Sequence, residues 1–247
     1  MDGRYTTRDR AHGPLGEGQA LVLARKNCEW RLHAYPAQPF FTAQAVFVNN
    51  TRKPVRVARL IPWAVDAGRG GALHVGPGAD QALILEDGRI LSQFNDFAQV
   101  VTGGSQGQWN LALWNPQSGR TLVAGFLSHG HGYTQFRLER DSGTKNTRFY
   151  WFSAECVYDP PVEVAPGAAF ASELLYVAVG ERNPHEGLER YGDMLAAFHG
   201  KRPRPAFIPH GWDSWSTSLG SGISEETLLA DLDAMDRELK RYGWTHF

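Results

Sequence analysis

Apolar, aromatic and β-branched residues gather in short runs up to about residue 180, and turn-forming residues separate these runs; two of the runs, 109–114 and 133–138, alternate between apolar and polar positions. Alternation with a period of two places one side of a segment in a core and the other in solvent, as in a half-buried β-strand. We therefore predict about ten short strands, over residues 20–24, 40–48, 55–65, 82–91, 109–114, 121–127, 133–138, 147–156, 162–164 and 172–179. Such strands predict a mainly β fold, a large antiparallel β-sandwich (a supersandwich), over residues 1–182.

The pattern becomes helical near residue 183. The Asn183 side chain can cap a helix, and Pro184 suits the first helical position. Apolar residues then recur at intervals of three or four, so one face of the helix is apolar. These residues are Leu188, Tyr191, Leu195 and Phe198. Gly200 suits the end of the helix, and the charged, Pro-rich stretch after it predicts a connecting helix and linker over residues 183–206.

The last segment, residues 207–247, has the pattern of a strand, a helix and the beginning of another strand. Residues 207–215 form the predicted strand, and Ser224 is the predicted cap of the helix. The apolar stripe of this helix consists of Leu228, Leu232, Met235, Leu239 and Tyr242. One such βα unit cannot bury its own faces, so we expect it to need parallel neighbours.

Composition narrows the class of protein. The net charge is −1, from 25 basic and 26 acidic residues, which argues against nucleic-acid binding because that rests on clustered positive charge. Two cysteines, Cys28 and Cys156, are too few for a disulfide framework or a zinc site. No apolar run reaches the length of a membrane span, and the polar start shows no signal-peptide pattern. We therefore expect a cytoplasmic protein that binds neither nucleic acid nor membrane.

The most specific pattern lies at residues 209–215, Pro-His-Gly-Trp-Asp-Ser-Trp, and continues at residues 223–226, 233–235 and 239–243. It resembles the first βα unit of the (β/α)8 barrel in the α-galactosidase clan, and is most similar to glycoside hydrolase family 36 and its raffinose-synthase-like relatives. In that family a large β-sandwich, a helix and a linker precede the barrel. The resemblance implies an N-terminal portion of such an enzyme, in which residues 207–247 begin a truncated barrel.

The resemblance also implies which residues meet the sugar. Barrel active sites lie at the C-terminal ends of the strands, and alternation puts Gly211, Asp213 and Trp215 on one side of the predicted strand. In the family the second Trp of this motif lines the pocket for the terminal galactose, which makes Trp215 a substrate-binding residue. Asp213 bonds either a sugar hydroxyl, as a second substrate-binding residue, or a loop amide.

No catalytic residue can be assigned within the chain. Retaining hydrolysis needs one carboxylate as nucleophile and one as acid/base. In the family both are Asp, on the fourth and sixth barrel strands, which would lie beyond residue 247. We therefore expect the chain alone to be inactive. No cofactor and no metal is implied, because His129 and His131 lie two residues apart without a third ligand.

The full-length protein is thus expected to be a retaining glycoside hydrolase that acts on terminal α-galactosides of oligosaccharides. Two alternatives stay open: an α-galactosyltransferase of the raffinose-synthase type, which would share the fold, and a non-catalytic carbohydrate-binding sandwich. One sandwich aromatic, Trp63, Trp109 or Trp114, could reach the sugar pocket, and the sequence does not choose among them. The sequence does not determine the oligomeric state, and a homo-oligomer stays open.

Overall fold

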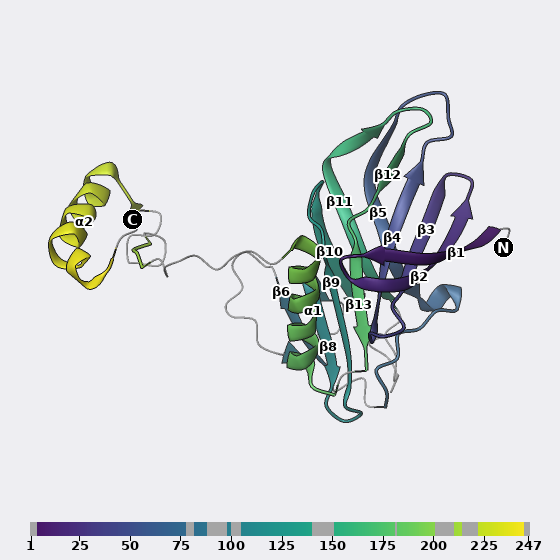
Figure 1. Cartoon of the computed structure of the whole chain (residues 1–247), viewed down its shortest axis with the longest axis horizontal. Coiled ribbons are helices and arrows are strands. Elements are labelled where there is room, and N and C mark those ends of the chain that lie inside the picture. Colours follow the sequence, from purple (N-terminus) through teal and green to yellow (C-terminus); the bar gives the residue numbers. More distant parts are fainter. Residues whose placement is uncertain are drawn as a thin grey trace. The chain divides into compact units, whose positions relative to one another are not determined.

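The structure, a computed structural model, describes residues 4–77, 82–87, 98–99, 105–139, 151–180, 182–200, 210–213 and 222–244. The chain divides into two compact units, Met1–Lys201 and Arg202–Phe247. The first consists of β-strands and one long helix, and the described part of the second contains one α-helix and a short 3₁₀ helix (Figure 1). The predicted mainly β fold class is confirmed. The predicted boundaries after residues 182 and 206 stay predictions.

The strands of the first unit all pair antiparallel. They are β1 (Arg4–Gly13), β2 (Gly16–Arg25), β3 (Cys28–Ala34), β4 (Phe40–Val48), β5 (Val55–Asp66), β6 (Leu83–Asp87), β7 (Ala98–Gln99), β8 (Ser105–Asn115), β9 (Arg120–Phe126), β10 (Tyr133–Glu139), β11 (Trp151–Val164), β12 (Ala169–Ala171) and β13 (Leu175–Val179). The short 3₁₀ helix η1 (Ala67–Arg69) follows β5, and α1 (Pro184–His199) follows β13.

Two of the longer strands, β1 and β3, were not among the predicted segments. Charged residues occupy many of their positions, so local hydrophobicity does not mark them. They form because β1 pairs with β2 and β3 pairs with both β2 and β4. Conversely, residues 162–164 are not a separate strand but the end of β11, which continues to pair with β5 after an irregularity.

Strand β8 joins the two halves of one curled sheet. Its second half pairs with β9 and β6, whereas its first half pairs with β10. The order β1-β2-β3-β4-β13-β9 therefore continues through β8 into β10-β11-β5, and β4 packs against β5 (Figure 1). Trp109 lies at the change of partner and has a backbone φ of 57°. The predicted sandwich is thus a single hydrogen-bonded sheet that folds back on itself.

The space between the two halves of the sheet contains the larger core. Leu113, Ala124 and Val177 enter it from one half, and Phe136 and Phe152 enter it from the other. Because strands alternate, the residues between these side chains point to the outer surface of the sheet.

Helix α1 covers the outer surface of the β8–β9–β13 region. Asn183 caps it by accepting a hydrogen bond from the backbone N–H of His185 at 3.0 Å, as predicted. Its apolar face packs on a second core that includes Val123, Tyr176 and Tyr191. The Tyr191 hydroxyl donates to the carbonyl oxygen of Phe126 at 2.7 Å, which joins the helix to the sheet. Strands β9 and β13 are therefore buried on both faces.

In the second unit, α2 (Glu225–Glu238) begins with a capping box between Ser224 and Thr227 and is followed by the 3₁₀ helix η4 (Lys240–Tyr242). Of the predicted stripe, Met235 is buried, while Leu232 and Tyr242 are 42% and 69% exposed. The stripe is therefore only partly covered within this unit. The predicted strand at 207–215 is described only over residues 210–213, where Gly211 forms an isolated bridge.

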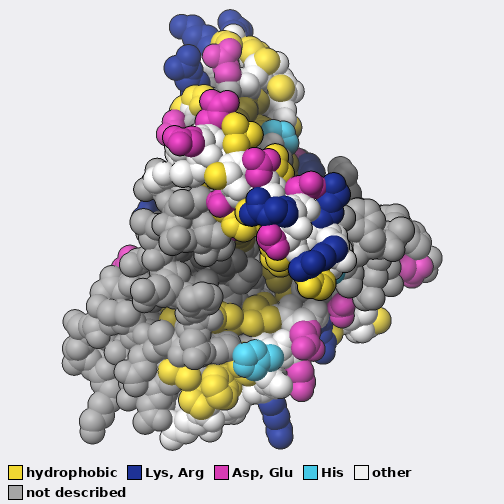
Figure 2. All heavy atoms as spheres, turned by 90° about the vertical axis from the view of Figure 1, so that its left-hand side faces the viewer, with side chains coloured by type: hydrophobic (Ala, Val, Ile, Leu, Met, Phe, Trp, Pro, Cys, Tyr) yellow, Lys and Arg dark blue, Asp and Glu magenta, His cyan; other side chains and the backbone are white. Residues whose placement is uncertain are grey.

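None of the helices among the described residues has the length and apolar character needed to cross a membrane. On the face of the molecule drawn in Figure 2, acidic and basic side chains are interspersed.

The contact between α1 and β9 gives a stability test. A Cβ at Gly125 would lie 2.4 Å from the Tyr191 ring, so Gly125→Ala should push α1 away from the sheet and cost about 1–3 kcal/mol. Gly192→Ala is the control on α1, because nothing lies within 4 Å of its added Cβ. It should be neutral or stabilise the helix by up to about 1 kcal/mol. Urea unfolding measures both, and equal effects would contradict the packing of α1 on β9.

Candidate functional site

The predicted sugar-binding motif is only partly described. Asp213 is exposed and Trp212 is half-buried in the second unit. Trp215 lies outside the described residues. The role of both residues in substrate binding stays a prediction.

The three sandwich tryptophans differ sharply in their surroundings. Trp63 packs edge-on against Phe41 and Phe152, with ring centroids 5.4 Å and 5.3 Å away, and so belongs to the core. Trp114 is half-buried. Trp109 is 51% exposed and sits in the left-handed backbone region, which costs a bulky residue of order 1–3 kcal/mol. Among the three, Trp109 therefore presents the largest fraction of its surface to a ligand.

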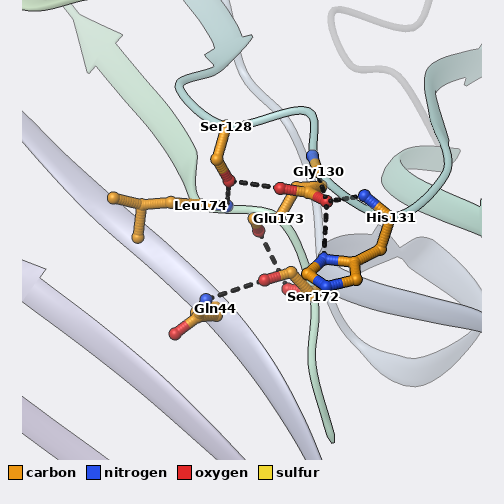
Figure 3. Close-up of polar contacts among 7 residues, drawn as sticks. All are labelled: Gln44, Ser128, Gly130, His131, Ser172, Glu173 and Leu174. Atoms are coloured by element: carbon orange, nitrogen blue, oxygen red, sulfur yellow. Dashed lines mark hydrogen bonds and ion pairs between the residues drawn. The ribbon is translucent and has the colours of Figure 1, made fainter. Parts of the chain in front are cut away.

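A polar cluster centred on Glu173 joins the loop after β9 to the segment before β13 (Figure 3). One carboxylate oxygen accepts hydrogen bonds from the backbone N–H groups of Gly130 and His131, both at 2.9 Å. The other accepts from the Ser128 hydroxyl, whose oxygen accepts from the Leu174 N–H at 3.0 Å. Glu173 is buried, and its four lone-pair directions are largely used by these donors.

This arrangement fixes a loop and leaves little for chemistry. His131 Nδ1 lies 3.6 Å from the same carboxylate, so that oxygen faces three nitrogen atoms. Ser128 contacts the carboxylate itself and not an imidazole, so the cluster lacks the order of a serine, histidine and acid triad. We interpret Glu173 as the anchor of the 128–131 turn.

The histidines of this turn do not form a metal site with their neighbours. Burial lowers the pKa of His129, although the nearby Glu173 carboxylate opposes the shift, so the ring is neutral near pH 7. His199 is bonded to the Leu127 carbonyl oxygen at 2.7 Å. Among the described residues, no group of three or more His, Cys, Asp or Glu side chains could hold a metal ion.

Two further titratable groups lie beside Glu173. Burial raises the pKa of the Cys156 thiol to about 12, and the Glu173 charge adds to the shift. Burial, with the Cys156 and Glu173 charges, also raises the pKa of Tyr158. Both groups are therefore neutral near pH 7, and a neutral buried thiol is a poor nucleophile.

A second buried carboxylate, Glu155, lies on the opposite surface of β11 from Cys156. It accepts hydrogen bonds from Gln135 at 2.9 Å and from Ser153 at 2.7 Å. Arg59 and Arg137 lie 3.2 Å and 3.8 Å from its oxygens. The two guanidinium groups offset the cost of burying the charge. Glu155, like Glu173, is fully engaged in structure.

These two carboxylates were missed by the prediction from sequence. The available signal was a Glu within each of two predicted strand segments, 147–156 and 172–179. Apart from Ser153, which is close to Glu155 in sequence, their partners lie far along the chain, as with Ser128 and Glu173, and no local pattern links them. Among the described acidic side chains, only these two are buried, and neither is free to act as nucleophile or acid/base.

Comparison with solved structures shows that known enzymes have a fold similar to that of this chain. An α-galactosidase from Lactobacillus brevis matches 95% of this chain with a TM-score of 0.55 at 13% identity. The family 36 α-galactosidase AgaB from Geobacillus stearothermophilus matches 96% of this chain with a TM-score of 0.55. A variant of AgaA from that organism, in complex with 1-deoxygalactonojirimycin, matches 95% of this chain with a TM-score of 0.56. AgaA and AgaB are each 16% identical to this chain.

The likeness confirms the predicted resemblance at the level of the fold: the chain is built like the N-terminal β domain of family 36 α-galactosidases. It spans 34% of the Lactobacillus enzyme and 36% of each Geobacillus enzyme. The sequence itself matches no protein-family model and no curated protein.

The Glu173 anchor can be tested by removing its charge. Glu173→Gln replaces acceptors with an amide that faces N–H donors, so we expect a loss of about 1.5–3 kcal/mol in the free energy of unfolding. Glu163→Gln is the control on β11, because Glu163 is 61% exposed and its pair with Arg56 at 3.9 Å is worth less than about 1 kcal/mol. Urea midpoints that fall equally would contradict the anchoring role.

The buried Cys156 thiol predicts an alkaline loss of stability. The unfolded thiol ionises near pH 9 and the folded one near pH 12, so the folded state binds the extra proton between these values. Stability is therefore full below about pH 9 and falls above it, by up to about 1.4 kcal/mol per pH unit. Cys156→Ala should flatten this slope in urea titrations from pH 8 to 11, whereas Cys28→Ala should not. Unchanged slopes in both variants would contradict the shift.

Proposed function

We propose that the chain is the N-terminal portion of a retaining glycoside hydrolase that acts on terminal α-galactosides. The observation that carries the proposal is the fold, which is similar to that of two α-galactosidases over 95% of this chain. The motif at residues 209–215 supports it independently, because it resembles the first barrel strand of the same enzymes and comes after the β domain in the same order.

The parts of the chain have different roles in this proposal. Residues 1–182 are a supporting sandwich, 183–206 connect it to the barrel, and 207–247 begin the barrel. Trp215 and Asp213 contact the terminal sugar. The nucleophile and the acid/base are supplied by residues outside these 247, which agrees with the engagement of Glu155 and Glu173 in structural bonds.

The same similar structures support the proposed substrate class. A variant of AgaA has been seen in complex with raffinose, an oligosaccharide with a terminal α-galactose. We infer that this protein takes α-galactoside oligosaccharides of that kind. A cytoplasmic location belongs to the same proposal, because both cysteines are free thiols and one of them is exposed, which suits a reducing compartment.

The proposal predicts where activity resides. The purified 247-residue chain should not hydrolyse 4-nitrophenyl α-galactoside, because in this proposal the nucleophile and the acid lie outside it. The same chain extended by the coding sequence that follows it in the gene should hydrolyse the substrate, and Trp215→Ala should lower kcat/KM of that protein about tenfold or more. The β-galactoside isomer is the control substrate.

Two outcomes would contradict this assignment. Turnover by the 247-residue chain would place a catalytic pair within it. An extended protein that is inactive on α-galactosides would contradict the proposed substrate class. Incubation of the extended protein with an α-galactosyl donor and sucrose separates hydrolysis from transfer, because a transferase yields a longer saccharide and a hydrolase yields free galactose.

A further inference from the structure

A cavity of about 510 Å³ opens in the first unit, at the end of the sheet where β8 turns into β9 (Figure 1). Three parts of the chain line it: residues 73–75, residues 118–122 of the turn and of β9, and Val179, Gly180 and Arg182 at and after the end of β13. We call it the β9 cavity. Its volume lies within the range of about 300–1,000 Å³ that is usual for small-molecule sites.

Hydrogen bonds between distant parts of the chain hold one wall of the β9 cavity. The Asn115 amide, at the end of β8, donates to the carbonyl oxygens of Val75 at 3.0 Å and Pro77 at 2.8 Å. The Ser118 hydroxyl donates to the Val75 carbonyl oxygen at 2.6 Å. A Cβ at Gly76 would lie 2.6 Å from Ser118 Cβ, so this segment lies directly against the β8–β9 turn. The wall is therefore fixed in place.

The titratable side chains that line the cavity, among the residues that the structure describes, are all basic. They are His74, Arg120 and Arg182, and each is exposed. A cavity lined by charges of one sign raises the local concentration of ions of the opposite sign. The lining therefore favours an anion as the ligand.

The position of Arg120 follows from the register of the sheet. Arg120 pairs directly with Asn115, and directly paired residues of antiparallel strands share a face. Arg120 therefore lies on the face on which Asn115 holds the cavity wall. Its Cδ would lie 3.6 Å from a Cβ at Gly76, so its side chain extends along that wall. Val179 pairs with Leu122, the next residue of β9 on this face, and is 55% exposed.

Arg182, which follows β13, lies beside the same turn. Its Cγ would lie 4.0 Å from a Cβ at Gly119, the residue that precedes Arg120. Neither guanidinium group has an acidic partner within the described parts of the chain, whereas Arg31 and Arg59 each pair with a glutamate. Two like charges beside one turn repel each other, and a bound anion would offset this repulsion.

A phosphate monoester matches these side chains better than other anions do. It carries about two negative charges near pH 7 and presents three acceptor oxygens, whereas a carboxylate carries one charge on two oxygens. Guanidinium groups bind phosphate oxygens with paired N–H donors. An extended polyanion would need a row of basic side chains along a surface, but these three line one cavity. The volume of the cavity leaves room for the organic part of an ester.

We propose that the β9 cavity binds a small phosphate monoester. Arg120 and Arg182 hold the phosphate oxygens, His74 lies in the same lining, and the exposed Val179 side chain contacts the organic part. The site lies within the first unit and includes no residue of the motif at 209–215, so it does not depend on the proposed hydrolase.

Calorimetry on the 247-residue chain with glucose 1-phosphate tests the proposal. We expect saturable binding of one molecule per chain that weakens as NaCl rises from about 0.02 M to about 0.2 M, because salt screens charges at an exposed site. Glucose is the neutral control and should give no binding. Inorganic phosphate should bind more weakly than the ester, because it lacks the organic part that contacts Val179.

Three variants locate the site. Arg120→Gln and Arg182→Gln should each raise the Kd of glucose 1-phosphate about tenfold, as expected for the loss of a hydrogen bond from a charged donor. Arg56→Gln is the matched control, because it removes the same charge from a side chain that is 77% exposed and lies on β5 outside the cavity. It should leave the Kd unchanged. Circular dichroism verifies that each variant is folded.

Several results would overturn the proposal. They are a lack of binding of glucose 1-phosphate, equal effects of Arg120→Gln and Arg56→Gln, inorganic phosphate that binds as tightly as the ester, and binding that is lost in Trp215→Ala but kept in Arg120→Gln. The last result would place the ligand at the motif of residues 209–215 and would leave the proposed hydrolase intact.

Discussion

Burial of the central strands on both faces is the constraint on which the first unit depends. Leu122, Ala124 and Phe126 of β9 enter the inner core, while Val123 faces the layer closed by α1. A strand covered on one face only would leave Tyr176 and Val123 in water, so the sheet and the helix stabilise each other. Gly125 allows the close approach, and the Tyr191 hydroxyl satisfies the Phe126 carbonyl oxygen at the end of β9. The helix that precedes the linker is thus part of the folded β unit.

Burial also explains why Glu155 and Glu173 are not catalytic candidates. A carboxylate in the interior must be paired or hydrogen-bonded, and Glu155 and Glu173 meet this requirement in two different ways. Glu173 uses backbone N–H groups and a hydroxyl to hold a turn, whereas Glu155 uses two arginines on the outer surface of β10, β11 and β5. A catalytic pair needs carboxylates that remain available to a substrate.

Local signals predicted the elements whose ends are set by nearby residues. Asn183 with Pro184 marked the start of α1, Ser224 marked the start of α2, and the run rich in aromatic and β-branched residues at 40–48 coincides with β4. Strands β1 and β3 escaped prediction because their formation depends on pairing with neighbours and not on their own hydrophobicity. The bend of β8 at Trp109 and the Glu173 cluster also depend on residues far apart in sequence. For the site, the sequence named Asp213 and Trp215, whereas the bonds that engage Glu155 and Glu173 join residues far apart in sequence and could be found only in three dimensions.

We propose that this β unit serves a barrel enzyme whose catalytic carboxylates are not among the 247 residues. The most direct measurement is the nucleotide sequence that follows the codon for Phe247 in the gene. The proposal predicts an open frame that continues into several more βα units, with an Asp at the end of each of two later strands. A stop codon directly after Phe247, or a continuation without further βα units, would contradict it.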